Sequence, residues 1–250
     1  MLEAGMDQGA GLRRWMVPQQ TLQLIAMARH GDAETELPLL WQLCSALHGS
    51  GQTVAVLDGS SAETESSPGL QHWLDGSHWP GDAPAQGPAW PVFPSAVGLA
   101  GLQHGRIARA QALHLLGALL KDYGVVLAYA PAPALAALLA GSQATPLVAV
   151  SPAATTVLTG YAALKTLLGA GLKPALAAQG TLPGPSTDAA LASVRRTLQQ
   201  CARTYLGEQL GVLTIHVAAH DDRPSADLQR LAGHLLENAM PICQDAQAPL

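Results

Sequence analysis

The residues best placed for chemistry lie in the segment Arg29–Leu37, between an apolar run of strand length and a helical pattern. A loop that binds phosphate needs glycines, which turn backbone N–H groups toward the anion, a Lys to meet its charge, and a Ser or Thr to hold Mg²⁺. This segment has one glycine, Gly31, and three carboxylates, Asp32, Glu34 and Glu36. Because like charges repel by about 4 kcal/mol at a separation of about 4 Å in a partly desolvated site, we expect the segment to reject a triphosphate.

Apolar runs alternate with helical patterns along the chain, in the order that a mostly parallel sheet covered by helices requires. We expect strands at Leu22–Met27, Thr53–Leu57, Pro91–Phe93, Gly124–Tyr129, Pro146–Val150, Pro174–Ala178 and Val212–Val217. We expect helices at Pro38–Leu47, His104–Tyr123, Pro133–Ala140, Val157–Ala170, Ser186–Leu206 and Ser225–Met240. The sequence therefore predicts the α/β class, with a doubly wound, mostly parallel sheet of about seven strands and helices on both faces.

The predicted α/β domain covers residues 21–242 and has a short segment at each end. Residues 1–20 are polar and carry a short helical pattern, Asp7–Met16, that ends at Pro18. We expect this segment to be a separate helix on a tether. Residues 243–250 form a short polar tail without a basic amphipathic face.

One long segment of the predicted domain, Ser60–Gly87, is rich in Ser, Gly and Pro and shows no clear periodicity. We expect a loop here. Its tryptophans, Trp73 and Trp79, favour a loop that is anchored to the core, because this side chain buries a large apolar area.

Composition excludes several classes of function. The chain has 250 residues, 48% of them hydrophobic, a net charge of −5 and no run of Lys or Arg, so we expect no nucleic-acid partner. No apolar stretch reaches the roughly 20 residues of a membrane span, and membrane association is unsupported. The N-terminus lacks the pattern of a secretory signal, so we expect a cytoplasmic protein. The cysteines Cys44, Cys201 and Cys243 are far apart and odd in number, which favours reduced thiols and no metal site.

Four stretches of the chain resemble the MinD/ParA family of deviant P-loop ATPases, and the resemblance covers nearly all of residues 21–240. They are Gly51–Asp58, Lys121–Leu127, Val148–Pro152 and Thr159–Lys165. The resemblance implies the P-loop NTPase fold of the MinD/ParA type.

The positions that bind nucleotide in this family carry other residues here. Counting back from Asp58 without gaps, the family's phosphate loop falls on Gly31, Asp32, Ala33, Glu34, Thr35, Glu36 and Leu37. The phosphate-binding lysine then falls on Glu36 and the magnesium-binding hydroxyl residue on Leu37. The resemblance therefore implies a degenerate nucleotide loop.

The other family positions have changed as well. The second Asp of the family's Asp-x-Asp pair is Ser60, the catalytic Asp falls on Leu127, and the Asn that contacts adenine falls on or near Ala178. Asp58 alone remains as a vestigial residue. It is interpreted as a polar strand end that caps the following turn, with metal contact as the alternative.

A second, local resemblance lies at the N-terminus, in Met6–Arg14. It is similar to the Asp-Gln-Ala-x-x-Leu-Arg motif of the FlhG (FleN) subfamily, MinD-like regulators of flagellar number, with Gly9 in place of the Ala. The matching residues are Asp7, Gln8, Leu12 and Arg13. In that subfamily the motif forms a helix that docks on FlhF, a GTPase of the signal-recognition-particle type, and stimulates its GTP hydrolysis. A Gln can orient the attacking water, and an Arg can stabilise charge that develops on the phosphoryl group.

The resulting hypothesis is a non-hydrolysing FlhG-like regulator of flagellar number or placement, a pseudo-ATPase that acts by protein binding. It implies an FlhF-type GTPase as partner, flagellar switch or basal-body proteins as further partners, and recruitment to the cell pole. We expect no cofactor, and a monomer or a dimer that does not depend on ATP. Two alternatives remain open: an active ATPase that uses ATP and Mg²⁺ through other contacts, for instance near Ser60–Ser67, and a MinD-like scaffold of another polar assembly.

Overall fold

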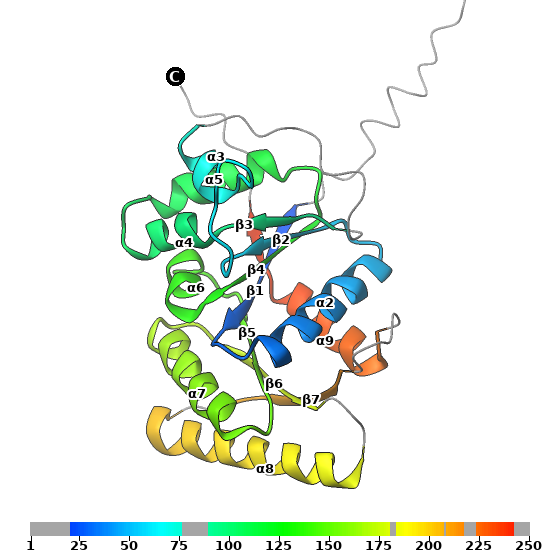
Figure 1. The fold of residues 1–250 in the computed structure, drawn as a ribbon. Coiled ribbons are helices and arrows are strands. Elements are labelled where there is room, and N and C mark those ends of the chain that lie inside the picture. Colours follow the sequence, from blue (N-terminus) through cyan, green and yellow to red (C-terminus); the bar gives the residue numbers. More distant parts are fainter. Residues whose placement is uncertain (1–20, 77–89, 181–183, 208, 218–223, 243–250) are drawn as a thin grey trace, which may run out of the picture.

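The computed structural model describes residues 21–76, 90–180, 184–207, 209–217 and 224–242. These residues form an eight-stranded sheet between two layers of helices (Figure 1). Within these ranges no helix is both long and apolar enough to cross a membrane. The expected N-terminal helix and C-terminal tail lie outside the described ranges.

The sheet confirms the predicted fold class. Its strands are β1 (Leu22–Arg29), β2 (Val54–Asp58), β3 (Val92–Pro94), β4 (Val125–Pro131), β5 (Leu147–Val150), β6 (Ala175–Gly180), β7 (Val212–His216) and β8 (Met240–Ile242). Seven strands run in the order β3-β2-β4-β1-β5-β6-β7, and all their pairings are parallel. β8 is antiparallel to the first half of β1.

Helices cover both faces of the sheet. They are α2 (Ala33–Gly49), α3 (Leu70–Leu74), α4 (Ala96–Gln103), α5 (Arg109–Leu119), α6 (Ala132–Leu138), α7 (Ala154–Gly169), α8 (Pro185–Cys201) and α9 (Ala226–Glu237), with a π-helical turn at Ala202–Leu206. α2 and α9 pack on one face, and α3 to α8 pack on the other (Figure 1). The central strands are buried on both sides, which explains why they read as continuous apolar runs in the sequence.

The strand register places the ends of the central strands together. Arg29, the last residue of β1, pairs with Pro131 at the end of β4, and Asp58 at the end of β2 pairs with Tyr129. The start of α2 lies directly beyond these strand ends. In open parallel sheets this edge is where ligands bind.

Three expectations about elements are wrong in detail. The helix expected at His104–Tyr123 is shorter, because it is α5, which begins at Arg109 after a turn in which Gly105 has a φ of +68°; α4, which ends at Gln103 before that turn, was not expected. The helix expected to continue to Met240 stops at Glu237, because the chain turns there and Met240 joins the sheet through β8.

The third correction concerns the segment expected to be a loop between Ser60 and Gly87. It contains the short helix α3, which carries Trp73 into the core, where its ring contacts Phe93 edge-on at 5.2 Å between centroids. The anchoring expected of Trp73 is confirmed. Trp79 lies outside the described residues.

Candidate functional site

Three residues, His30–Asp32, join β1 to α2 at the edge of the sheet where ligands bind in such folds. Gly31 has a φ of +101°, a left-handed conformation that allows this tight turn. The loop expected over Arg29–Leu37 is therefore too long: α2 begins at Ala33. An acidic helix cap with further acidic residues in the first turn, as found here, favours an early helix start.

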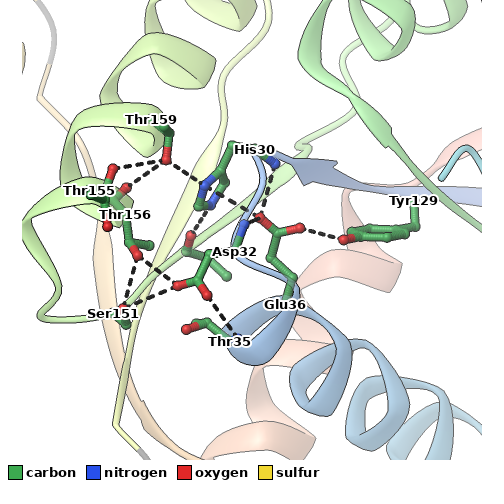
Figure 2. Close-up of polar contacts among 10 residues, drawn as sticks. His30, Asp32, Thr35, Glu36, Tyr129, Ser151, Thr155, Thr156 and Thr159 are labelled. Atoms are coloured by element: carbon green, nitrogen blue, oxygen red, sulfur yellow. Dashed lines mark hydrogen bonds and ion pairs between the residues drawn. The ribbon is translucent and has the colours of Figure 1, made fainter.

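Glu36 is fully buried at the start of α2, and its carboxylate fills the interior of this turn. Oε1 accepts the backbone N–H of His30 at 3.0 Å and that of Asp32 at 3.1 Å, while Oε2 accepts the hydroxyl of Tyr129 (Figure 2). Backbone N–H groups at a helix N-terminus form an anion site. The anion in this site is a side chain of the protein itself.

His30 closes the site on the side of β5 and α7. Its Nε2 donates to the carbonyl oxygen of Ala149 at 2.5 Å, and its Nδ1 lies 3.0 Å from the hydroxyl of Thr159 and 3.4 Å from Oε1 of Glu36. The His30 side chain is 3% exposed. The imidazole therefore covers the carboxylate of Glu36 and ties the turn to two neighbouring elements (Figure 2).

Asp32 caps α2 and connects it to the start of α7. Its Oδ1 accepts the backbone N–H of Thr35 at 3.3 Å, and its Oδ2 accepts the hydroxyls of Thr156 at 2.6 Å and Ser151 at 3.3 Å. Burial acts to raise the pKa of Asp32, but the hydrogen bonds from Thr156, Thr35 and Ser151 outweigh it and hold the pKa below its ordinary value. Both oxygens of this carboxylate therefore already accept hydrogen bonds from other residues of the protein.

Tyr129 is the residue of β4 whose side chain reaches the site. Burial raises its pKa well above the ordinary value of 10.0, and its hydrogen bond to Glu36 raises it further. The hydroxyl therefore stays protonated and donates a hydrogen bond to Glu36. Leu127, where the resemblance placed the catalytic Asp, is fully buried in the middle of β4, two residues before Tyr129.

The remaining residues of the expected loop lie on the outside of α2. Ala33, Glu34 and Leu37 are exposed, and Leu37 leaves 47% of its surface accessible. Of the three carboxylates of this segment, Glu36 is buried inside the turn, Asp32 caps α2 beside it and Glu34 is exposed.

Asp58 lies at the end of β2, beside this site. Its Oδ1 accepts the backbone N–H of Ser60 at 2.8 Å and the Ser60 hydroxyl at 2.6 Å, and its Oδ2 accepts the hydroxyl of Ser61 at 2.6 Å. These bonds hold the turn that follows β2.

The segment Ser60–Ser67 contains a further carboxylate, Glu63, that accepts backbone N–H groups. Glu63 accepts those of Val97 at 2.8 Å and Gly98 at 3.0 Å, in the first turn of α4, and that of Gln71 at 3.1 Å. The N-terminus of α4, like that of α2, thus donates hydrogen bonds to a carboxylate of the protein itself.

A hollow of about 360 Å³ lies beside the site and is lined by Thr35, Ser151, Gln179 and Thr187 among others. Ala178, where the resemblance placed the adenine contact, is buried within β6 and does not line it. The next residue, Gln179, is 2% exposed, and its Oε1 has no hydrogen-bond partner among the described residues. Gln179 is thus the polar residue at this end of β6.

The structure brings together residues that the sequence did not connect. His30, Tyr129 and Thr156 were not singled out, because their partners lie far away along the chain, and Gln179 was not, because it lies in a buried, mainly apolar strand. The matching residues of the N-terminal motif, Asp7, Gln8, Leu12 and Arg13, lie outside the described ranges.

No known sequence family and no curated protein matches the chain. Its structure is similar to several solved ones. McdA from Cyanothece in an ATP complex is 12% identical, with 88% of this chain and 96% of that chain covered and a TM-score of 0.61. Cobyrinic acid a,c-diamide synthase from Mycobacterium smegmatis is 19% identical, with 86% and 94% covered and a TM-score of 0.54. The MinD cell division protein of Aquifex aeolicus is 12% identical, with 88% and 99% covered and a TM-score of 0.52.

These similarities define the fold. The chain has the parallel α/β fold of MinD/ParA-type P-loop ATPases over most of its length. At 19% identity or less, the comparisons extend to the fold and not to the chemistry of the site.

The hydrogen bond from Tyr129 to Glu36 leads to a first prediction. Tyr129→Phe leaves a buried carboxylate oxygen without its donor, so we expect the free energy of unfolding to fall by about 1–3 kcal/mol. Urea unfolding followed by circular dichroism measures this. Tyr161→Phe, on α7 and away from the site, is the matched control and should change stability by less than about 0.5 kcal/mol. Equal stability of the two variants would contradict the role of Tyr129.

The lowered pKa of Asp32 leads to a second prediction. A carboxylate with a lowered pKa in the folded state adds stability above its unfolded-state pKa, close to 3.8, and this stability is lost as the pH falls below that value. Asp32→Asn keeps a capping side chain but removes the charge. We expect the variant to be less stable than the native chain near neutral pH, and the difference to shrink as the pH falls below 3.8. A difference that stays constant across this range would contradict the assignment.

Proposed function

We propose that this chain is a non-hydrolysing FlhG-like regulator of flagellar number or placement, which acts by binding other proteins. In this proposal Asp7, Gln8, Leu12 and Arg13 stimulate an FlhF-type GTPase, while the MinD/ParA-type body serves as a scaffold that does not need nucleotide. Flagellar switch or basal-body proteins are further partners of that scaffold.

The observation that carries the pseudo-ATPase part is the position of Glu36. The N–H groups of His30 and Asp32 donate to it, so they are not available to a phosphate. A phosphate within about 4 Å of this carboxylate would meet a repulsion of about 4 kcal/mol at intermediate dielectric. Moving Glu36 aside would also break its bond from Tyr129 and bring a buried charge toward solvent. We therefore propose that neither ATP nor Mg²⁺ is a cofactor, and that the chain is a monomer or a dimer that does not depend on ATP.

One alternative is an active ATPase. Similar structures include a ParA-family ATPase and an ATP complex of McdA, and the hollow lined by Gln179 and Thr35 lies next to the turn between β1 and α2. This alternative requires Glu36 to leave the anion position or the phosphates to lie elsewhere. The segment Ser60–Ser67, considered above for such contacts, contains Glu63, whose carboxylate already accepts three backbone N–H groups.

The GTPase-activating role is tested with the full chain and an FlhF-type GTPase from the same organism. We expect the native chain to stimulate GTP hydrolysis, and Gln8→Ala and Arg13→Ala each to reduce that stimulation by about tenfold or more, because they remove the group that orients water or stabilises phosphoryl charge. Arg14→Ala, next to the motif, is the matched control and should keep the stimulation. This function would be contradicted if the native chain left the rate of GTP hydrolysis unchanged, or if Gln8→Ala and Arg13→Ala stimulated it as strongly as the native chain.

A further inference from the structure

Strand β7 forms one edge of the sheet and has β6 as its neighbour among the strands that the structure describes. It lies between α8 and α9, at the end of the sheet away from β3 (Figure 1). Its outer side presents backbone groups that can pair with another strand.

The hydrogen bonds between β7 and β6 show which residues of β7 have backbone groups that point outward from the sheet. Gly211 accepts the N–H of Leu176, and Val217 donates to the carbonyl oxygen of Gly180 at 2.9 Å. In a parallel pair alternate residues make these bonds, so residues 211, 213, 215 and 217 face β6. The N–H and C=O groups of residues 212, 214 and 216 therefore point away from the sheet.

A groove of about 890 Å³ runs along this edge. Its floor includes the exposed side of β7, where Leu213 leaves 42% of its surface accessible. The groove thus offers an apolar contact beside a row of backbone donors and acceptors. These are the two components of strand addition, in which main-chain bonds give affinity and side-chain contacts give specificity.

The charged residues of the groove are mainly basic, although the chain has a net charge of −5. Lys173, Arg195 and Arg230 line it, together with one carboxylate, Asp227. Asp227 forms an ion pair with Arg230. Lys173 at the start of β6 and Arg195 on α8 are both exposed and leave the groove with an excess of positive charge.

We propose that β7 is a docking site for an acidic, extended peptide segment of a partner protein, which adds to the sheet as a further strand. Its backbone pairs with residues 212, 214 and 216, and its acidic side chains lie near Lys173 and Arg195. Charge favours this occupant over a second copy of the chain. A second copy of the chain would bring a groove with the same excess of positive charge, and like charges across an interface disfavour it.

The test uses the full chain and a fluorescent peptide of alternating Val and Glu as the probe. Fluorescence anisotropy should show binding that weakens as salt rises, since the attraction is partly electrostatic. Two further peptides separate the contributions: one carries Lys in place of Glu, and the other carries N-methyl groups that block strand pairing. We expect each to bind about tenfold more weakly or worse.

Charge-reversing variants locate the site. Lys173→Glu combined with Arg195→Glu should weaken binding of the Val-Glu peptide by about tenfold or more, whereas Lys165→Glu, an exposed residue of α7 outside the groove, should leave it unchanged.

A backbone variant tests the pairing directly. In Thr214→Pro the lost N–H faces away from β6, so the ladder to β6 keeps its bonds, and an unchanged circular dichroism spectrum checks the fold. We expect Thr214→Pro also to lose binding of the Val-Glu peptide.

Three outcomes would overturn the proposal. The first is that the Val-Glu peptide does not bind at about 1 mM, the weakest affinity that such contacts would give. The second is that the N-methylated or the Lys peptide binds equally well. The third is a dimer of the chain that forms through β7, seen by sedimentation and abolished by Thr214→Pro, which would assign the edge to a second copy.

Discussion

The site depends on one interaction, the hydrogen bonds that the carboxylate of Glu36 accepts from the backbone of His30 and Asp32. The frame of a strand, a tight turn and a helix N-terminus directs N–H groups at one point, and such a point favours an anion. Glu36 supplies that anion from within the chain. Because the carboxylate is covalently attached, it fills the position without the loss of translational freedom that a bound ligand incurs.

The same carboxylate connects otherwise separate parts of the fold. Tyr129 links it to β4, and His30 links the turn to β5 and α7. The neighbouring Asp32 adds hydrogen bonds to the start of α7. The turn between β1 and α2 is thus held by the chain's own side chains. This accounts for a turn that keeps its geometry with the carboxylates of Asp32 and Glu36 at the start of α2.

The fold could be predicted from the sequence because buried parallel strands leave continuous apolar runs and sheet-covering helices leave a periodic pattern. The short antiparallel strand β8 was missed, since three residues that follow a helix carry no pattern of their own. In the site, the excess of carboxylates was visible, but their positions were not. Glu36 meets Tyr129, which lies 93 residues away along the chain. Such contacts depend on strand register, which sequence spacing alone does not determine.

The central claim, that Glu36 occupies the place of a phosphate, is tested most directly by titrating the full chain with a non-hydrolysable ATP analogue in a calorimeter, with and without Mg²⁺. We expect the native chain to show no binding that depends on Mg²⁺. Saturable, Mg²⁺-dependent binding with a dissociation constant of about 1 μM corresponds to a binding free energy of about −8 kcal/mol, which a site with a buried carboxylate beside the phosphate would not reach. That result would show that Glu36 does not occupy the place of a phosphate.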